Sequence, residues 1–146
     1  MSAESPSRKQ NIGKVIQATY ACQKSCMEMY AYAQQKHPSD VILKGYEGEI
    51  SRLTETINES GNPVGAAAFT MMLGEISNRK PNAQYVARSI DFLEGAASGK
   101  FNTRYLSAAK KLTETISNRI RSGDQNARKR LRVIKERLNV KLGRKQ

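Results

Sequence analysis

The stretch that decides the fold is residues 103–142, which read TRYLSAAKKLTETISNRIRSGDQNARKRLRVIKERLNVKL. On both sides of a short break at residues 122–124, apolar residues recur at the three- or four-residue spacing of one buried helix face. They are Leu106, Ala109, Leu112, Ile116 and Ile120, followed by Ala127, Leu131, Ile134, Leu138 and Leu142. The break contains a glycine and Asp124, a good N-cap residue. The stretch therefore predicts two helices, over residues 103–121 and 125–142.

Four more helical segments precede this pair, and residues that stop or start helices separate them. Prolines follow His37 and Lys80, and a residue that precedes proline is driven out of the helical region. Gly61 and Gly99 end two segments, and Asn62 before a proline is typical of a helix start. The segments are residues 12–36, 40–60, 63–79 and 82–98. No segment alternates apolar and polar residues for long enough to predict a strand.

The chain of 146 residues is predicted to form one all-α domain. A chain of this size buries roughly two thirds of its unfolded surface in a single core. Short connections favour antiparallel packing of successive helices, so we expect a compact bundle of about five to six helices. We assign residues 1–10 to a flexible N-terminal segment, residues 11–142 to the helical domain and residues 143–146 to a basic tail.

Two short phrases recur in the predicted helices. Residues 53–57 read LTETI and so do residues 112–116, while ISNR occurs at residues 76–79 and again at 116–119. An old duplication of a three-helix unit is one interpretation. Chance coincidence of common helical residues is the other, and the sequence leaves both open.

The positive charge is concentrated near the C-terminus. Lys and Arg number 25 against 13 Asp and Glu, which gives a formal net charge of +12. Residues 1–103 carry 11 basic and 10 acidic side chains and are close to neutral. Residues 104–146 carry 14 basic side chains and only three acids. Such asymmetry is typical of a segment that faces nucleic acid or an anionic membrane.

We expect the last two helices to present a cationic surface, gathered at one end of the domain. Like charges held together repel one another until an anion neutralises them. Arg also offers a planar fork of donors that matches phosphate oxygens. The candidate nucleic-acid-binding residues are Lys110, Lys111, Arg119, Arg121, Arg128, Lys129, Arg132, Lys135, Arg137, Lys141, Arg144 and Lys145. The alternative is a solvated face that only aids solubility, although such faces usually mix both signs.

Nucleic acid is favoured over a membrane as the anionic partner. A membrane-surface helix normally carries Trp or Phe beside its cations, and no aromatic residue follows Tyr105. The turn at residues 122–124 is only weakly similar to a helix-turn-helix, so we expect phosphate contacts that tolerate changes of base sequence. Phe101 and Tyr105 are candidates for stacking on unpaired bases, although aromatics at helical spacing more often belong to a core. Charge does not distinguish RNA from DNA.

No signature of catalysis, of a metal site or of a bound cofactor occurs. Cys22 and Cys26 lie one helical turn apart, but His37 is the only histidine, so we expect buried cysteines rather than a zinc site. Residues 61–65 lack the Gly-Lys-Ser/Thr of a phosphate loop. No apolar run reaches the roughly 18 residues of a membrane span, and the N-terminus lacks the pattern of a secretion signal. We expect a protein of the cytoplasm, nucleoid or virion interior.

These patterns predict a non-enzymatic structural protein that binds phosphate backbones in several copies, together with other subunits or with itself. In size, basicity and helicity the chain resembles the small helical subunits of RNA-guided CRISPR effector complexes and helical nucleocapsid proteins. That resemblance rests on composition and implies a place in a nucleoprotein assembly. One alternative is a helical adaptor whose cations bind an acidic protein. Another is a regulator with a true recognition helix.

Overall fold

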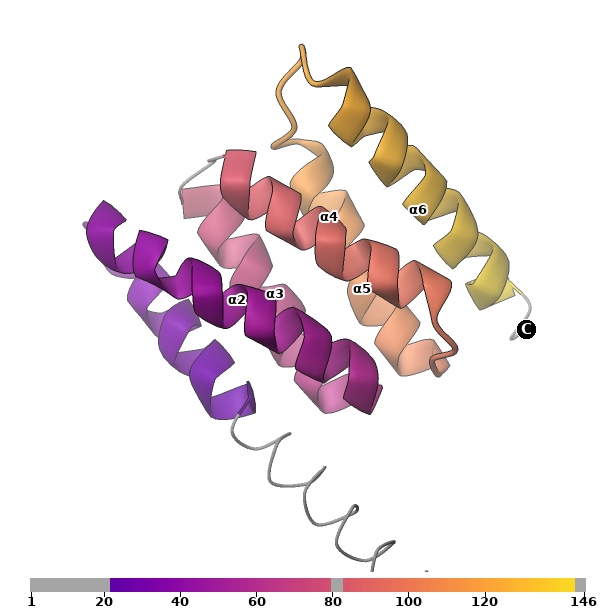
Figure 1. Cartoon of the computed structure of the whole chain (residues 1–146), viewed down its shortest axis with the longest axis horizontal. Helices are drawn as coiled ribbons and strands as arrows, with labels where there is room; N and C mark the ends of the chain where they lie inside the picture. The colour runs from indigo at the N-terminus through magenta and orange to yellow at the C-terminus, as the bar shows by residue number, and fades with distance from the viewer. Residues whose placement is uncertain (1–21, 80–82, 144–146) are drawn as a thin grey trace, which may run out of the picture.

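The computed structural model describes residues 22–79 and 83–143, and every regular element in these ranges is an α-helix. Residues 22–33 form the first described helix. The others are α2 (Asp40–Ser60), α3 (Pro63–Arg79), α4 (Ala83–Ser98), α5 (Thr103–Ser117) and α6 (Gln125–Gly143) (Figure 1). The predicted all-α bundle is confirmed. The segment of residues 1–10 and the tail residues 144–146 lie outside the described residues.

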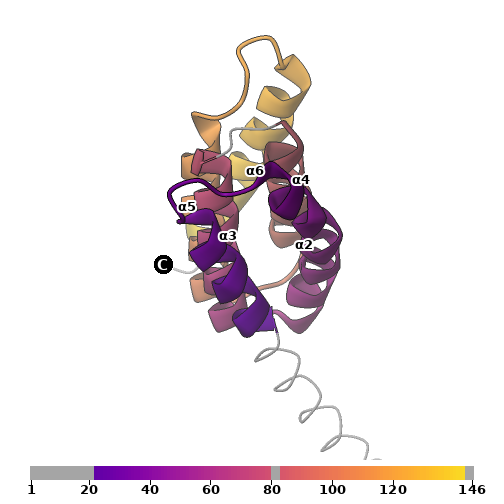
Figure 2. The same cartoon turned by 90° about the vertical axis from the view of Figure 1, so that its left-hand side faces the viewer.

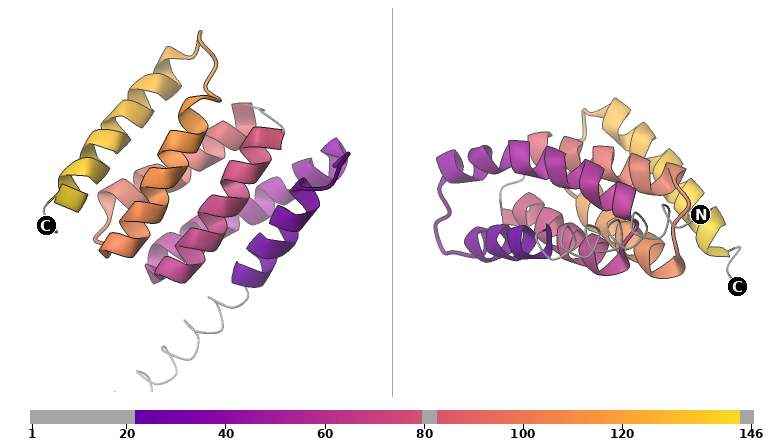
Figure 3. Two further views of the ribbon diagram at one scale, coloured as in Figure 1. Left: turned by 180° about the vertical axis from the view of Figure 1, so that it is seen from behind. Right: turned by 60° about the horizontal axis from the view of Figure 1, so that its bottom comes forward.

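The helices pack in two layers, and α6 lies along one edge of both. The helix of residues 22–33, α3 and α5 lie side by side in one layer, and α2 and α4 form the other (Figures 2 and 3). α6 contacts α4 and α5 and closes the edge of the bundle (Figure 1). Successive helices run in opposite directions, so α3 and α5 run parallel to each other and pack closely. The C-terminal helix is therefore a peripheral element with one side on each layer.

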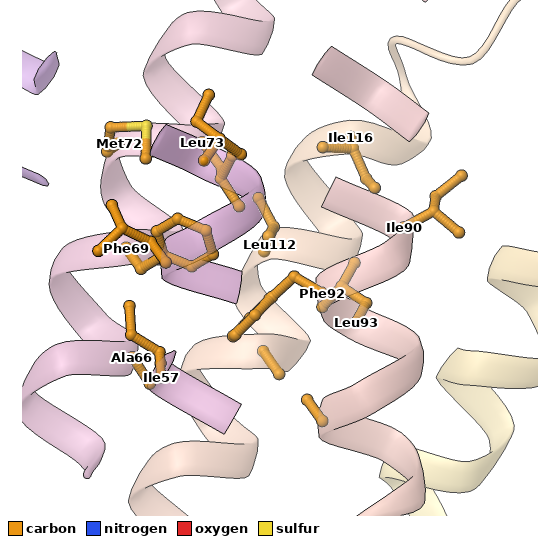
Figure 4. Packing of buried hydrophobic residues seen from close by; sticks show 14 of the residues in the cluster. Ile57, Ala66, Phe69, Met72, Leu73, Ile90, Phe92, Leu93, Leu112 and Ile116 are labelled. Carbon is orange, nitrogen blue, oxygen red and sulfur yellow. The ribbon is translucent and has the colours of Figure 1, made fainter. Parts of the chain in front are cut away.

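Aromatic side chains from three helices meet at the centre of the bundle. The ring centroids of Phe69 and Phe92 are 5.0 Å apart, those of Phe92 and Tyr105 are 6.3 Å apart, and all three residues are buried. Figure 4 shows Phe69 and Phe92 among the aliphatic side chains that fill the space between α3, α4 and α5. Asn58 of α2 accepts a hydrogen bond from the Tyr105 hydroxyl, and its amide donates to the Phe92 carbonyl at 3.4 Å. This polar bridge ties the two layers together.

The two cysteines belong to the core. Cys22 and Cys26 are buried and free, as the sequence predicts. Burial, with smaller contributions from the neighbouring Cys22 and Glu49, raises the pKa of the Cys26 thiol to about 12. The thiol is therefore neutral in the folded protein at physiological pH.

Short polar side chains begin the helices at the predicted places. Asn62 Oδ1 accepts from the backbone N–H of Val64 at 2.9 Å, and Asn102 Oδ1 accepts from Tyr105 N at 2.9 Å. Asp124 Oδ1 accepts from Ala127 N at 3.0 Å and starts α6. These bonds satisfy backbone donors that a helix leaves free in its first turn.

Two helix ends lie earlier in the chain than predicted. The first described helix ends at residue 33 rather than 36, and α5 ends at Ser117 rather than at residue 121. The Ser117 hydroxyl donates back to the Thr113 carbonyl at 2.6 Å, and Asn118 occupies the C-cap. Asn is a weak helix former, so the chain leaves the helix here although Ile120 continues the apolar spacing. Residues 119 and 121 consequently lie on a connection.

A single duplication does not account for both recurring phrases. LTETI lies on α2 and on α5, whereas ISNR lies at the end of α3 and at the end of α5. If three consecutive helices had been duplicated, α5 would correspond to a single earlier helix. The LTETI phrase relates α5 to α2, whereas the ISNR phrase relates it to α3, so one duplication explains at most one of the two recurrences. The two ISNR phrases touch, because Arg119 Nε donates to Asn78 Oδ1 at 3.0 Å.

Candidate nucleic-acid interface

Four apolar side chains fix the rotation of α6 on the bundle. Ala127, Leu131, Ile134 and Leu138 are buried, which confirms the apolar stripe predicted from the sequence. Successive side chains of a helix are turned by about 100°. The stripe therefore determines which basic residues of α6 face α4, which face α5 and which face solvent.

On the side towards α4, Arg130 is neutralised by acids of that helix. Its Nε donates to Glu94 Oε1 at 2.7 Å, and its Nη2 lies 3.1 Å from Asp91 Oδ1. Nη2 also contacts Glu94 Oε1. Arg130 is not among the candidates predicted from the sequence, and its position three residues after Ala127 places it beside the buried stripe. The charge of Arg130 therefore helps to hold α6 against α4.

Lys141 also holds α6 to α4. Its ammonium donates to the backbone carbonyls of Gly99, at 2.7 Å, and of Ala97. These carbonyls lie at the C-terminal end of α4, where helix oxygens have no partner within the helix and a cation is favoured. The phosphate contact of Lys141 stays a prediction from the sequence; in the structure the side chain is half-buried and bonded to these two carbonyls.

On the side towards α5, basic residues line an open groove of about 340 Å³, which we call the basic groove. Its lining residues are Ser117, Ile120, Arg128, Leu131, Arg132, Lys135, Glu136 and Asn139. Arg128 and Arg132 are exposed and Lys135 is half-buried. Within residues 22–79 and 83–143, none of these three cations forms a salt bridge. Lys110 lies about two turns before Ser117, so it shares the same side of α5.

The other candidates are spread over different faces. Lys111 lines a groove between α3 and α5 together with Glu75. Lys129 and Arg137 line a groove on the α4 side of α6, which Glu94 and Arg130 share. Of the dozen cations predicted to gather at one end, the ten within the described residues divide among several surfaces of the bundle.

Arg119 and Arg121 lie near the start of α6. They line a pocket of about 230 Å³ together with Val86 and Ala87 of α4. Arg119 is bonded to Asn78, as described above. Arg144 and Lys145 lie outside the described residues.

Phe101 and Tyr105 stack on each other. Their ring centroids are 4.0 Å apart with an interplanar angle of 11°. Tyr105 is 0% exposed, so its ring is not available to a base in this structure. Phe101 is half-buried, and one face of its ring is covered by Tyr105. Burial raises the pKa of the Tyr105 hydroxyl, which keeps it a neutral donor to Asn58.

The structure also bears on metal binding and on membrane insertion, within residues 22–79 and 83–143. No group of three or more His, Cys, Asp or Glu side chains in these ranges is arranged to hold a metal ion. None of the helices in these ranges combines the length and the apolar character that crossing a membrane requires. No family model matches the sequence, no curated protein matches it, and no solved structure matches the fold.

Proposed function

We propose that this protein binds nucleic acid without catalysis, and that the basic groove contacts the phosphate backbone. The observation that carries the proposal is the contrast between the two sides of α6. Arg130, towards α4, is neutralised by two carboxylates. Arg128, Arg132 and Lys135, towards α5, form no salt bridge in the described part of the chain, although Glu136 also lines their groove.

Unpaired cations on successive turns raise the free energy of the isolated protein, because like charges at this spacing repel. A phosphate polymer reverses the sign of that interaction and releases its condensed counterions when it binds. Arg128 and Arg132 add planar forks that match phosphate oxygens. The groove thus favours backbone contact that tolerates any base sequence, as suits a protein that coats or stabilises a nucleoprotein assembly in several copies.

The test is a salt titration of binding to a labelled mixed-sequence duplex. Changing Arg128, Arg132 and Lys135 together to Gln is expected to lower the log–log salt slope by about two to three units, because each lost contact with a duplex phosphate removes about 0.9. The matched control changes Lys24, Lys36 and Lys44 to Gln. These three are exposed and lie outside the groove, and their loss gives the same change of net charge.

Equal losses in the two variants mean that overall charge drives binding, and the groove assignment is then wrong. If the wild-type protein does not bind nucleic acid at low salt but does bind an acidic protein, the adaptor alternative replaces the proposal. Circular dichroism melting of both variants checks that each is folded.

A further inference from the structure

We infer that the basic groove takes double-stranded nucleic acid in preference to a single strand, an inference that rests on the proposed function. Three features of the described residues carry it: a straight row of cations, a rigid support beneath that row, and aromatic rings that are engaged elsewhere. Each of these features makes the binding free energy of a duplex more favourable than that of a single strand.

Three cations of the groove follow one side of α6, and Glu136 lines the groove beside them. Arg128, Arg132 and Lys135 occupy successive turns of α6, and Asn139 continues the row by one more turn. At about 1.5 Å of rise per residue, the row from Arg128 to Asn139 is about 16 Å long. A duplex is effectively straight over this length, since its persistence length is about 50 nm.

The row is also rigidly supported. Besides the buried stripe, the contacts of Arg130 and Lys141 fix α6 against α4 near both ends of the helix. A rigid partner with matching geometry loses little conformational freedom on binding, whereas a flexible single strand must be ordered along the row. The ordering cost therefore favours the duplex.

Charge density acts in the same direction. A duplex carries one phosphate charge per about 1.7 Å of its axis, and each strand alone carries one per about 3.4 Å. Each cation that meets a duplex phosphate also releases more bound counterion, about 0.9 against about 0.7 for a single strand. With three cations in the groove, this difference adds up over three phosphate contacts and favours the duplex.

Proteins that bind single strands usually offset the ordering cost and the lower charge density by stacking bases on aromatic rings within the cationic groove. Here Phe101 stacks on the buried Tyr105, and Tyr32 packs edge-on against Tyr46 at 5.9 Å. Among the described residues, the apolar lining of the groove is aliphatic, from Ile120 and Leu131. A single strand therefore gains phosphate contacts in this groove and little from its bases.

The experiment compares, by fluorescence anisotropy at low salt, a labelled DNA duplex with an oligothymidylate of the same number of phosphates. The duplex is expected to bind about five-fold tighter or more. The variant with Arg128, Arg132 and Lys135 changed to Gln is expected to lose this preference. A second variant, Phe101→Leu, keeps an apolar side chain over Tyr105 and is expected to bind both ligands as the wild type does.

Equal or tighter binding of the oligothymidylate overturns the inference. If the triple variant then loses that binding, the proposed function still stands. A selective loss of oligothymidylate binding in Phe101→Leu also overturns the inference, because it shows that the ring stacks on bases. Failure of the wild-type protein to bind either ligand refutes the proposed function itself.

Discussion

Arg128 and Arg130 are separated by one residue in α6, yet their side chains lie on opposite sides of the helix and have different neighbours. Arg130 turns towards α4 and lies between Asp91 and Glu94, while Arg128 turns towards α5 and lines the basic groove. The same side chain stabilises the fold at one position and remains unpaired at the other. Sequence composition does not separate the two, because the difference depends on which helices flank α6.

Replacing each of these arginines by Gln separates stability from binding. Arg130→Gln is expected to lower the free energy of unfolding by about 1 kcal/mol, because two partly exposed carboxylates lose their partner. Arg128→Gln is expected to change it by less than about 0.5 kcal/mol, but to reduce the salt slope of binding by about one unit. Urea denaturation and anisotropy titration measure the two effects. The reverse assignment of effects contradicts the description of α6.

The buried thiol of Cys26 predicts a loss of stability at alkaline pH. Its pKa is raised by burial from 9.0 to about 12, so the unfolded chain releases this proton first. The stabilisation is complete below pH 9 and is lost as the pH rises from there towards about 12, by about 1.4 kcal/mol per pH unit. Urea denaturation at a series of pH values checks this. Cys26→Ala is expected to show a shallower decline above pH 9, and an unchanged decline contradicts the assignment.

At the scale of the element, α6 is the part of the fold that the sequence predicts best. Its stripe, Ala127 to Leu138, keeps one helical period, so its buried face follows from spacing alone. The end of α5 is predicted wrongly because Ile120 keeps the apolar spacing while Asn118 stops the helix.

From the sequence, Tyr105 is a candidate for stacking on bases, but this residue lies one turn before Ala109 on the buried face of α5.

The docking of α6 on α4 predicts a specific role for Lys141. Lys141→Met keeps most of the aliphatic stem but removes the donor to the carbonyls of Ala97 and Gly99, so we expect a loss of about 1–2 kcal/mol in unfolding free energy. Lys135→Met, on the groove side of the same helix, is the matched control. It is expected to keep stability and to weaken nucleic-acid binding. Comparable stability losses in the two variants argue against the capping role.

At the scale of the whole molecule, the near-neutral part of the chain builds most of the scaffold, whereas the basic part supplies α5, which completes one layer, and α6, which closes the edge. The concentration of charge after residue 103 is visible in the sequence, and in the structure it falls mainly on α5, α6 and the connection between them. The distribution of that charge is not visible in the sequence. It depends on α4 supplying Asp91 and Glu94 to one side of α6, which is a tertiary contact between distant residues.

The most direct measurement of the central claim is an NMR titration of isotope-labelled protein with a short DNA duplex at low salt. Binding in the basic groove predicts shifts of the Arg128 and Arg132 Nε–H signals and of backbone amides near Ser117 and Lys135. The Arg130 Nε–H signal, held by Glu94, is expected to stay in place. Shifts confined to α2 and α3, or no shifts at all, contradict the claim that this groove binds the phosphate backbone.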